Sequence, residues 1–93
     1  MKIVSIDKVG STVYGCVDDG VYYHLFSADS GTPVVFEQKY DKNGYKDYGH
    51  FVLSYGMCDP CCLFLDDPVE IDATTIDELA YDYLCVVWES IWG

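Results

Sequence analysis

The stretch TVYGCVDDGVYYHLFSA, residues 12–28, contains two runs rich in valine, tyrosine and phenylalanine on either side of an Asp-Asp-Gly sequence. Residues of these types fit the pleated, half-buried surface of a β-sheet. Gly20 can adopt the positive φ that a tight turn between two strands requires. We therefore predict a β-hairpin here. The alternating sequence KIVSID, residues 2–7, predicts a short strand before it.

A second hairpin is predicted for PVVFEQKYDKNGYKDYGHFVLSY, residues 33–55. Its turn would be Asn43 and Gly44, a dipeptide typical of two-residue hairpin turns. This register sets aromatic residues and opposite charges across from one another, and pairs of both kinds stabilise antiparallel strands. The expected pairs are Phe36 with Phe51, Val34 with Leu53, Glu37 with His50, and Asp41 with Lys46.

The next segment, CCLFLDDPVEID, covers residues 61–72. Residues 62–65 are apolar enough for a buried strand, which we expect to end at Pro68 because proline cannot donate to a sheet ladder. Beyond the proline, valine and isoleucine alternate with Glu70 and Asp72. Both acids should therefore face outward.

The C-terminal part, residues 76–92, predicts an amphipathic helix. Its apolar residues recur at the spacing of one helix face. Thr75, with Glu78 three residues on, forms a capping-box pattern. Asp77 and Glu78 lie in the first turn, where the helix dipole favours negative charge. The apolar stripe consists of Ile76, Leu79, Ala80, Tyr83, Leu84, Val87, Trp88 and Ile91.

These elements predict an α+β fold. We expect an antiparallel sheet of four to five strands with two hairpins, and one C-terminal amphipathic helix packed on one face. A chain of 93 residues forms a single domain, residues 1–93, and such a domain buries about 60–65% of the surface that its unfolded chain exposes. That length leaves room for a sheet and one or two helices over a single core.

The charge distribution along the chain is uneven. The chain carries 16 acidic residues against five lysines, a net charge of −11. All five lysines lie within residues 1–46, whereas residues 47–93 contain ten acids and no base. Binding to nucleic acid or to an anionic membrane needs lysine or arginine to neutralise phosphates. Direct partners of both kinds are therefore excluded.

The location of the protein is predicted from its N-terminus and its cysteines. The N-terminus lacks the apolar stretch of a signal peptide, and no apolar run is long enough to cross a membrane. The five cysteines, an odd number, indicate reduced thiols rather than a disulfide framework. We therefore expect a cytoplasmic protein.

The motif CDPCC, residues 58–62, has the Cys-x-x-Cys spacing of redox dithiols and of half of many zinc sites. It leads into an apolar run instead of a helix N-terminus, and no second close pair of ligands completes a zinc site. We therefore expect a turn with packed cysteines and neither metal nor cofactor. A small zinc or thiol protein built on Cys58, Cys61 and Cys62 stays an alternative.

An enzyme is not predicted. His24 and His50 both lie within predicted strands, where they have ordinary structural roles. Nucleophilic catalysis needs a nucleophile, a base and oxyanion donors that converge in a pocket. Two hairpins and a helix offer little concavity for such a pocket. The sequence DKNGYKD, residues 41–47, lacks the ligand spacing of a calcium loop.

The acids of the second half predict a protein-binding surface, because surfaces of one sign are usually tied to a partner. On the helix, Tyr81, Cys85 and Trp92 form a second stripe beside the core-facing one, with acids between them. An acidic rim around aromatic anchors is typical of a protein interface. The predicted contact residues are Asp59, Asp66, Asp67, Glu70, Asp72, Tyr81, Asp82, Glu89 and Trp92.

The partner that this surface predicts is a basic protein whose basic channel handles nucleic acid. In size, charge and aromatic content the chain resembles small phage and mobile-element inhibitors, including anti-CRISPR and anti-restriction proteins that act as DNA mimics. The resemblance implies a non-enzymatic inhibitor or adaptor. The alternatives are an immunity or antitoxin protein for a basic toxin, and a protein that buries the second helical stripe in a homodimer.

Overall fold

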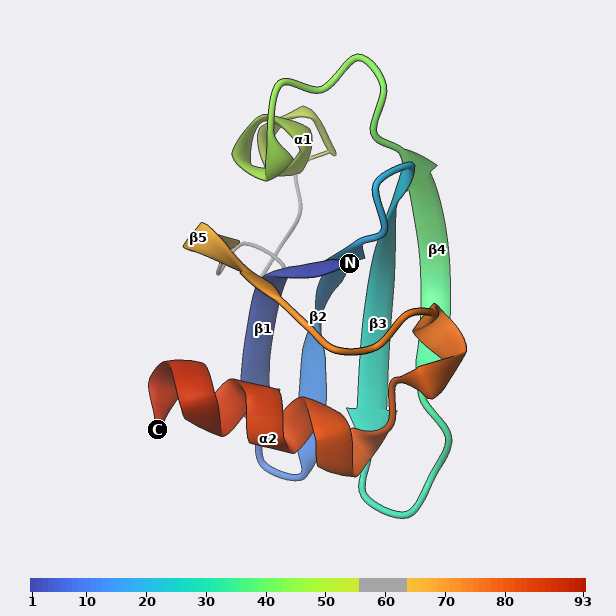
Figure 1. Ribbon diagram of the computed structural model, residues 1–93, viewed down its shortest axis with the longest axis vertical. Helices are drawn as coiled ribbons and strands as arrows, with labels where there is room; N and C mark the ends of the chain where they lie inside the picture. Colours follow the sequence, from blue (N-terminus) through green and yellow to red (C-terminus); the bar gives the residue numbers. More distant parts are fainter. Residues whose placement is uncertain (56–63) are drawn as a thin grey trace.

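The computed structural model describes residues 1–55 and 64–93, which form a five-stranded antiparallel sheet and three helical segments (Figure 1). The strands are β1 (Lys2–Val9), β2 (Thr12–Asp18), β3 (Tyr22–Asp29), β4 (Val35–Asp41) and β5 (Phe64–Glu70). The helices are α1 (Tyr48–Tyr55), the 3-10 helix η1 (Ile76–Glu78) and α2 (Tyr81–Trp92). The strand order is β4-β3-β2-β1-β5, so β4 and β5 are the edges. The predicted α+β class with a C-terminal helix is confirmed.

The hairpin predicted for residues 12–28 is confirmed as β2 and β3. Gly20 in its turn has a φ of 98°. Two aspartates organise the turn: Asp18 Oδ1 accepts a hydrogen bond of 2.8 Å from the N–H of Gly20, and Asp19 Oδ1 accepts from the N–H groups of Val21 and Tyr22. Aspartate side chains that bond the backbone a few residues on are a common way to fix a turn.

The hairpin predicted for residues 33–55 is wrong beyond β4, because residues 48–55 form α1. Asn43 and Gly44 do make a turn, in which the N–H of Tyr45 donates to the carbonyl of Lys42 at 3.2 Å. Gly44 has a φ of 93°, but the φ of Asn43 is not positive. The hairpin turn typical of Asn-Gly needs a positive φ at both residues. This turn is therefore of a type that splays the strands, and among the described residues no partner strand for β4 follows it.

Asp47 starts α1 instead of continuing a strand. Its carboxylate accepts a hydrogen bond of 2.8 Å from the N–H of His50, and its carbonyl accepts one from the N–H of Phe51. An aspartate in this position satisfies an N–H group that the first helical turn leaves free. In the β3–β4 ladder, Phe36 lies opposite Phe26 and Asp41 lies opposite Tyr22, in place of the predicted pairs.

β5 is an exposed edge strand. Of the buried strand predicted for residues 62–65, residues 62 and 63 lie outside the described part, and the prediction is wrong for Phe64, which is exposed, and for Leu65, which is half-buried. Its pairing with β1 is irregular: Glu70 and Val69 pair with the start of β1, and the next paired residue is Phe64. Pro68 lies in the unpaired stretch between them instead of ending the strand, which agrees with the tolerance of proline at edges and bulges. Glu70 and Asp72 are exposed, as the alternation predicted.

The C-terminal helix is shorter than predicted. Leu79 and Ala80 adopt extended backbone conformations, with ψ of 130° and 163°, and separate η1 from α2. The capping box of Thr75 and Glu78 is wrong, because Thr75 makes no side-chain cap. The carboxylate of Glu78 instead accepts hydrogen bonds from the N–H and the hydroxyl of Thr74, at 3.1 and 2.7 Å.

The apolar stripe of this helix is confirmed for α2 itself. Leu84 and Val87 are buried, and Trp88 and Ile91 pack against the same cluster while partly exposed. Ala80, which precedes the helix, is exposed. α2 therefore packs across the sheet through the side of the helix that the apolar periodicity predicted.

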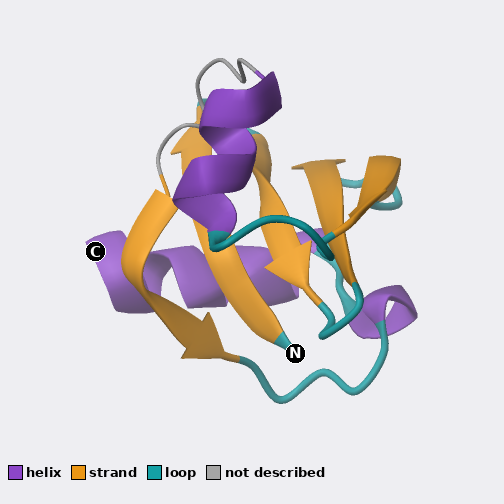
Figure 2. Cartoon of the chain, turned by 90° about the horizontal axis from the view of Figure 1, so that it is seen from above, coloured by secondary structure: helices purple, strands orange, loops and turns teal. Residues whose placement is uncertain are grey.

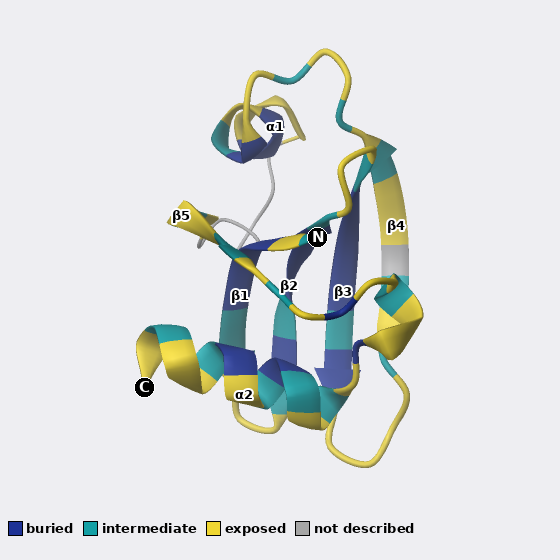
Figure 3. Cartoon of the chain, viewed as in Figure 1, coloured by how far each residue is buried: buried dark blue, intermediate teal, exposed yellow. Residues whose placement is uncertain are grey.

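Both faces of the sheet are covered, so the molecule has two apolar clusters where a single core was expected (Figures 2 and 3). α2 and the segment before it pack on one face, with Ile3, Ile6, Val13, Val17 and Phe26 beneath them. α1 packs on the other face, where Phe51 contacts the ring of Tyr23. Gly15 has no room for a side chain, since a Cβ there would lie 2.2 Å from the carbonyl oxygen of Ser5 and 2.6 Å from the Phe26 ring.

Candidate protein-binding surface

The predicted contact acids within the described residues lie on two elements. Four lie on β5 or directly after it, and all four are exposed. On α2, three exposed residues follow one another at the i, i+4, i+7 spacing that places them on one side of a helix. We refer to the following exposed residues together as the β5–α2 face: Asp66, Asp67, Glu70, Asp72, Asp82, Val86 and Glu89. Glu70, Asp72 and Val86 border one groove, whereas Asp66 lines a cavity beside α1.

A groove of about 200 Å³ joins the two elements of this face. Its apolar lining consists of Val69 and Ile71 from the strand side and Val86 and Val87 from the helix side, and Glu70 and Asp72 also border it. The hydroxyl of Tyr83 accepts a hydrogen bond of 3.0 Å from the backbone N–H of Asp72. This bond holds the end of the strand segment against α2.

The aspartates of residues 18–47 are bonded within the fold. Five of them accept hydrogen bonds or form ion pairs with groups in the turns, the strands and the start of α1. These pairs are Asp18 with Lys42, Asp19 with the turn N–H groups and His24, Asp29 with Thr12, Asp41 with Asn43, and Asp47 with His50.

The acids of the β5–α2 face are different. Within residues 1–55 and 64–93, five of them accept no side-chain hydrogen bond and form no ion pair. These five are Asp66, Asp67, Asp72, Asp82 and Glu89. Exposed carboxylates of one sign without a neighbouring base produce a negative potential that an approaching cation can sense. The fold therefore leaves these charges available for another molecule.

The lysines do not balance this surface. Lys42 pairs with Asp18 at 2.5 Å, the Nζ of Lys8 lies 5.6 Å from the centre of the Trp88 ring, and that of Lys39 lies 4.6 Å from the centre of the Tyr22 ring. Lysine ammonium groups over aromatic faces are stabilised by the ring quadrupole. Three of the five lysines are thus already engaged within the chain.

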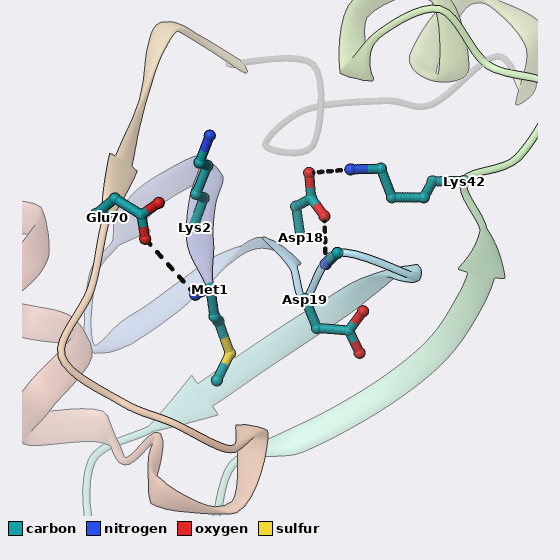
Figure 4. Close-up of a pocket in the computed structure, with 7 residues that line it drawn as sticks. Met1, Lys2, Asp18, Asp19, Lys42 and Glu70 are labelled. Atoms are coloured by element: carbon teal, nitrogen blue, oxygen red, sulfur yellow. Dashed lines mark hydrogen bonds and ion pairs between the residues drawn. The ribbon is translucent and has the colours of Figure 1, made fainter.

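Glu70 is the member of the face with a cationic partner. Its carboxylate lies 3.6 Å from the terminal amine of Met1, beside a cavity of about 250 Å³ (Figure 4). The pair of Asp18 with Lys42 lies at the other side of the same cavity, and Lys2 stands between them. The charges around this cavity largely neutralise one another, so it does not extend the acidic surface.

The two aromatic residues predicted as anchors are partly used by the fold. Tyr81 packs against the apolar cluster beneath α2, and its pKa is raised, chiefly by a hydrogen bond with the Cys85 thiol. The indole N–H of Trp92 donates to the carbonyl of Ile6 at 3.0 Å, while 52% of the residue stays exposed. Their role in partner binding remains a prediction.

Asp59 and the cysteines of the CDPCC motif, Cys58, Cys61 and Cys62, lie outside the described residues. In the part of the chain that the structure describes, no three His, Cys, Asp or Glu side chains come close enough to hold a metal ion. Of the two described cysteines, Cys16 is buried and Cys85 is half-buried.

Next to the charged cavity, the buried His24 of β3 pairs with the exposed Asp19 of the preceding turn. His24 Nε2 is 2.5 Å from Asp19 Oδ2, and the imidazole is packed edge-on against Tyr22 and Phe36. Burial alone raises the pKa of Asp19, but the hydrogen bonds from His24 and from the turn N–H groups outweigh it and lower the pKa. The prediction that His24 lies among aromatic residues is confirmed, whereas His50 lies in α1 and not opposite Glu37.

Sequence reasoning missed the groove and the residues that line it. Val86 is an aliphatic residue in neither apolar stripe of the helix, and 67% of it is exposed. The position of Val86 could have indicated the groove, because a large apolar side chain outside the packing stripes has no structural explanation. Tyr83 was placed in the core-facing stripe, and its bond to the strand segment could not be anticipated.

Comparisons of the chain with family models, with curated proteins and with solved structures find no match. Within the described residues, no helix has both the length and the apolar character that a membrane span requires.

Proposed function

We propose that the protein is a non-enzymatic inhibitor or adaptor that binds a basic, nucleic-acid-handling protein through the β5–α2 face. The observation that carries this proposal is that some acids are bonded within the fold and others are not. The aspartates of residues 18–47 are bonded within the chain, while five acids on the β5–α2 face have no described partner. Unbalanced charge destabilises a compact protein by self-repulsion, so its retention on one face favours a role in binding.

The charge of the chain selects the class of partner. Nucleic acid and anionic membranes share the sign of this surface and would be repelled. A basic protein surface is attracted, and such surfaces commonly serve to bind nucleic acid. An acidic protein that occupies a basic channel competes with the phosphate backbone, which is the mechanism we propose. The cytoplasmic location belongs to the same proposal and is supported by the odd number of cysteines, which favours reduced thiols.

The proposal is tested by quantitative affinity capture from an extract of the source organism. The site variant is Asp67→Asn with Asp72→Asn. The control variant is Asp7→Asn with Asp77→Asn, which removes the same charge from acids that have no described side-chain partner and lie outside the β5–α2 face. We expect the wild type and the control to retain a basic protein, and the site variant to retain about tenfold less of it, since two interface charges contribute about 1.4 kcal/mol together.

Added salt provides an independent check on the same complex. Screening at about 0.5 M salt should release the captured protein, because surface charges act over roughly a Debye length. Equal retention by both double variants would remove the proposed role of the face. The identity of the captured protein then separates an inhibitor of a nucleic-acid-handling enzyme from an immunity protein for a toxin.

A further inference from the structure

The groove between β5 and α2 has features that charge alone does not explain. Its floor is formed by valine and isoleucine side chains, and Val86 stands at its edge with 67% of its surface exposed. An acidic surface that attracts a partner only by charge has no need of an exposed aliphatic wall beside it. Interfaces gain most of their free energy from apolar side chains buried in small pockets and surrounded by polar groups.

The size and charge of the groove restrict the kind of molecule that can occupy it. A volume of about 200 Å³ is below the roughly 300–1,000 Å³ of typical cofactor and drug sites. It suits an aliphatic side chain. A second copy of the chain is disfavoured, because each copy carries a net charge of −11 and like charges across an interface repel.

Addition of a strand to the free edge of β5 is also disfavoured. Strand addition needs a regular row of unpaired N–H and C=O groups. β5 contains Pro68, which has no N–H, and its pairing with β1 skips the residues between Phe64 and Val69. Asp66 and Asp67 also lie in this stretch, and charged side chains on an edge strand disfavour pairing with another strand. The binding position is therefore the groove and not the strand edge.

We infer that the groove between Asp72 and Val86 binds a basic segment of the partner protein, with one aliphatic side chain seated among the groove valines and a lysine or arginine beside it paired with Asp72. This inference rests on the proposed function and adds the chemistry of the bound segment. Asp72 is exposed and has no described ion pair. Tyr83 accepts its bond from Asp72, which leaves its own O–H free to donate to a carbonyl of the segment.

The test is an NMR titration of the whole chain with two capped peptides, Lys-Lys-Leu-Lys-Lys and Lys-Lys-Ser-Lys-Lys, at low salt. The peptides match in charge and differ only in the aliphatic side chain. We expect the leucine peptide to bind the wild type about tenfold more tightly than the serine peptide. In Val86→Ser this preference should fall to about one. Val35→Ser, at the opposite edge strand with a comparable exposure of 56%, should retain it.

The contribution of charge is tested with Asp72→Asn, which should weaken the binding of both peptides by a similar factor. Urea unfolding of each variant shows that it is folded, and serine and valine have similar helix propensity. Equal binding of both peptides to the wild type, with weaker binding of both to Asp72→Asn, would overturn the groove inference and leave the proposed function standing.

Two further results would also overturn the inference. The first is binding of neither peptide to the wild type. If the capture experiment likewise showed no difference between the double variants, the proposed function would fail with it. The second is a dimer in light scattering that dissociates in Val86→Ser, which would assign the groove to a second copy of the chain.

Discussion

The β2–β3 turn and the β5–α2 face are both rich in aspartate, yet they use it in opposite ways. In the turn, Asp18 and Asp19 accept hydrogen bonds from backbone N–H groups, from His24 and from Lys42. On the face, the carboxylates of Asp67 and Asp72 have no such partner among the described residues. The same residue type therefore stabilises the fold in one region and stands free in the other. The carboxylates without a described partner are therefore the candidates for a functional role.

The largest expected effect is on the turn. Asp19→Ala removes the acceptor of three hydrogen bonds and leaves His24 buried without its partner. We expect the free energy of unfolding to fall by about 2–3 kcal/mol, because hydrogen bonds to a charged group are strong and buried donors are costly to leave unsatisfied. Urea unfolding measures this loss. Asp67→Ala is the matched control and should change stability by less than about 0.5 kcal/mol; equal losses in the two variants would contradict the comparison.

The pH dependence sharpens the same contrast. The pKa of Asp19 is lower in the folded protein than its ordinary value of 3.8. Its contribution to stability is therefore present above about pH 4 and is lost as the pH falls through the lowered folded pKa. The stability difference between the wild type and Asp19→Asn, measured by urea unfolding, should shrink between about pH 6 and about pH 2.5. A difference that stayed constant over this range would show that the carboxylate charge is not what stabilises the turn.

A smaller effect is expected at the ion pair between Asp18 and Lys42. Lys42 is only partly exposed and also lies 5.5 Å from the centre of the Tyr23 ring. We expect Lys42→Gln to lower the unfolding free energy by about 1 kcal/mol, between the values of an exposed and a buried pair. Lys46→Gln, at an exposed lysine without a described ion pair, should be close to neutral. Equal midpoints of thermal unfolding for the two variants would show that the pair contributes nothing.

The smallest effect is expected on the face itself. Neutralising Asp66, Asp67, Asp72 and Glu89 together should leave stability unchanged or raise it by up to about 1 kcal/mol, since their mutual repulsion disappears. Salt should also stabilise the wild type more than this variant, because it screens the same repulsion. Urea unfolding at two salt concentrations measures both changes. A marked loss of stability in the variant would mean that these acids hold the fold after all.

The sequence predicts the parts of the fold that depend on local pattern. The hairpin of residues 12–28 and the apolar stripe of α2 follow from β-propensity, a turn glycine and a helical period, and the structure has both. α1 was missed because Asn43 and Gly44 are compatible with two turn types. Asp47 is of a residue type favoured at helix N-termini, but the hairpin prediction placed it in a strand.

Other features depend on contacts between distant residues, and local pattern cannot supply them. The extended conformation at Leu79 and Ala80 interrupts an unbroken helical period, and Glu78 bonds Thr74 instead of Thr75. The exposure of the acids could be predicted from alternation. Which acids are bonded could not, since Asp18 meets a lysine 24 residues away and Asp19 meets a histidine on the next strand. The groove required the placement of β5 against α2.

The contrast between the bonded acids of the β2–β3 turn and the acids of the β5–α2 face is tested most directly by an amide NMR titration. The wild type is titrated with a peptide of four lysines at low salt. The peptide carries only the charge that the face should attract. We expect shift changes confined to residues 66–72 and 82–90, and none in the β2–β3 turn at residues 18–24, where the carboxylates are already bonded. Changes in the turn equal to those on the face, or spread evenly over the molecule, would contradict the account.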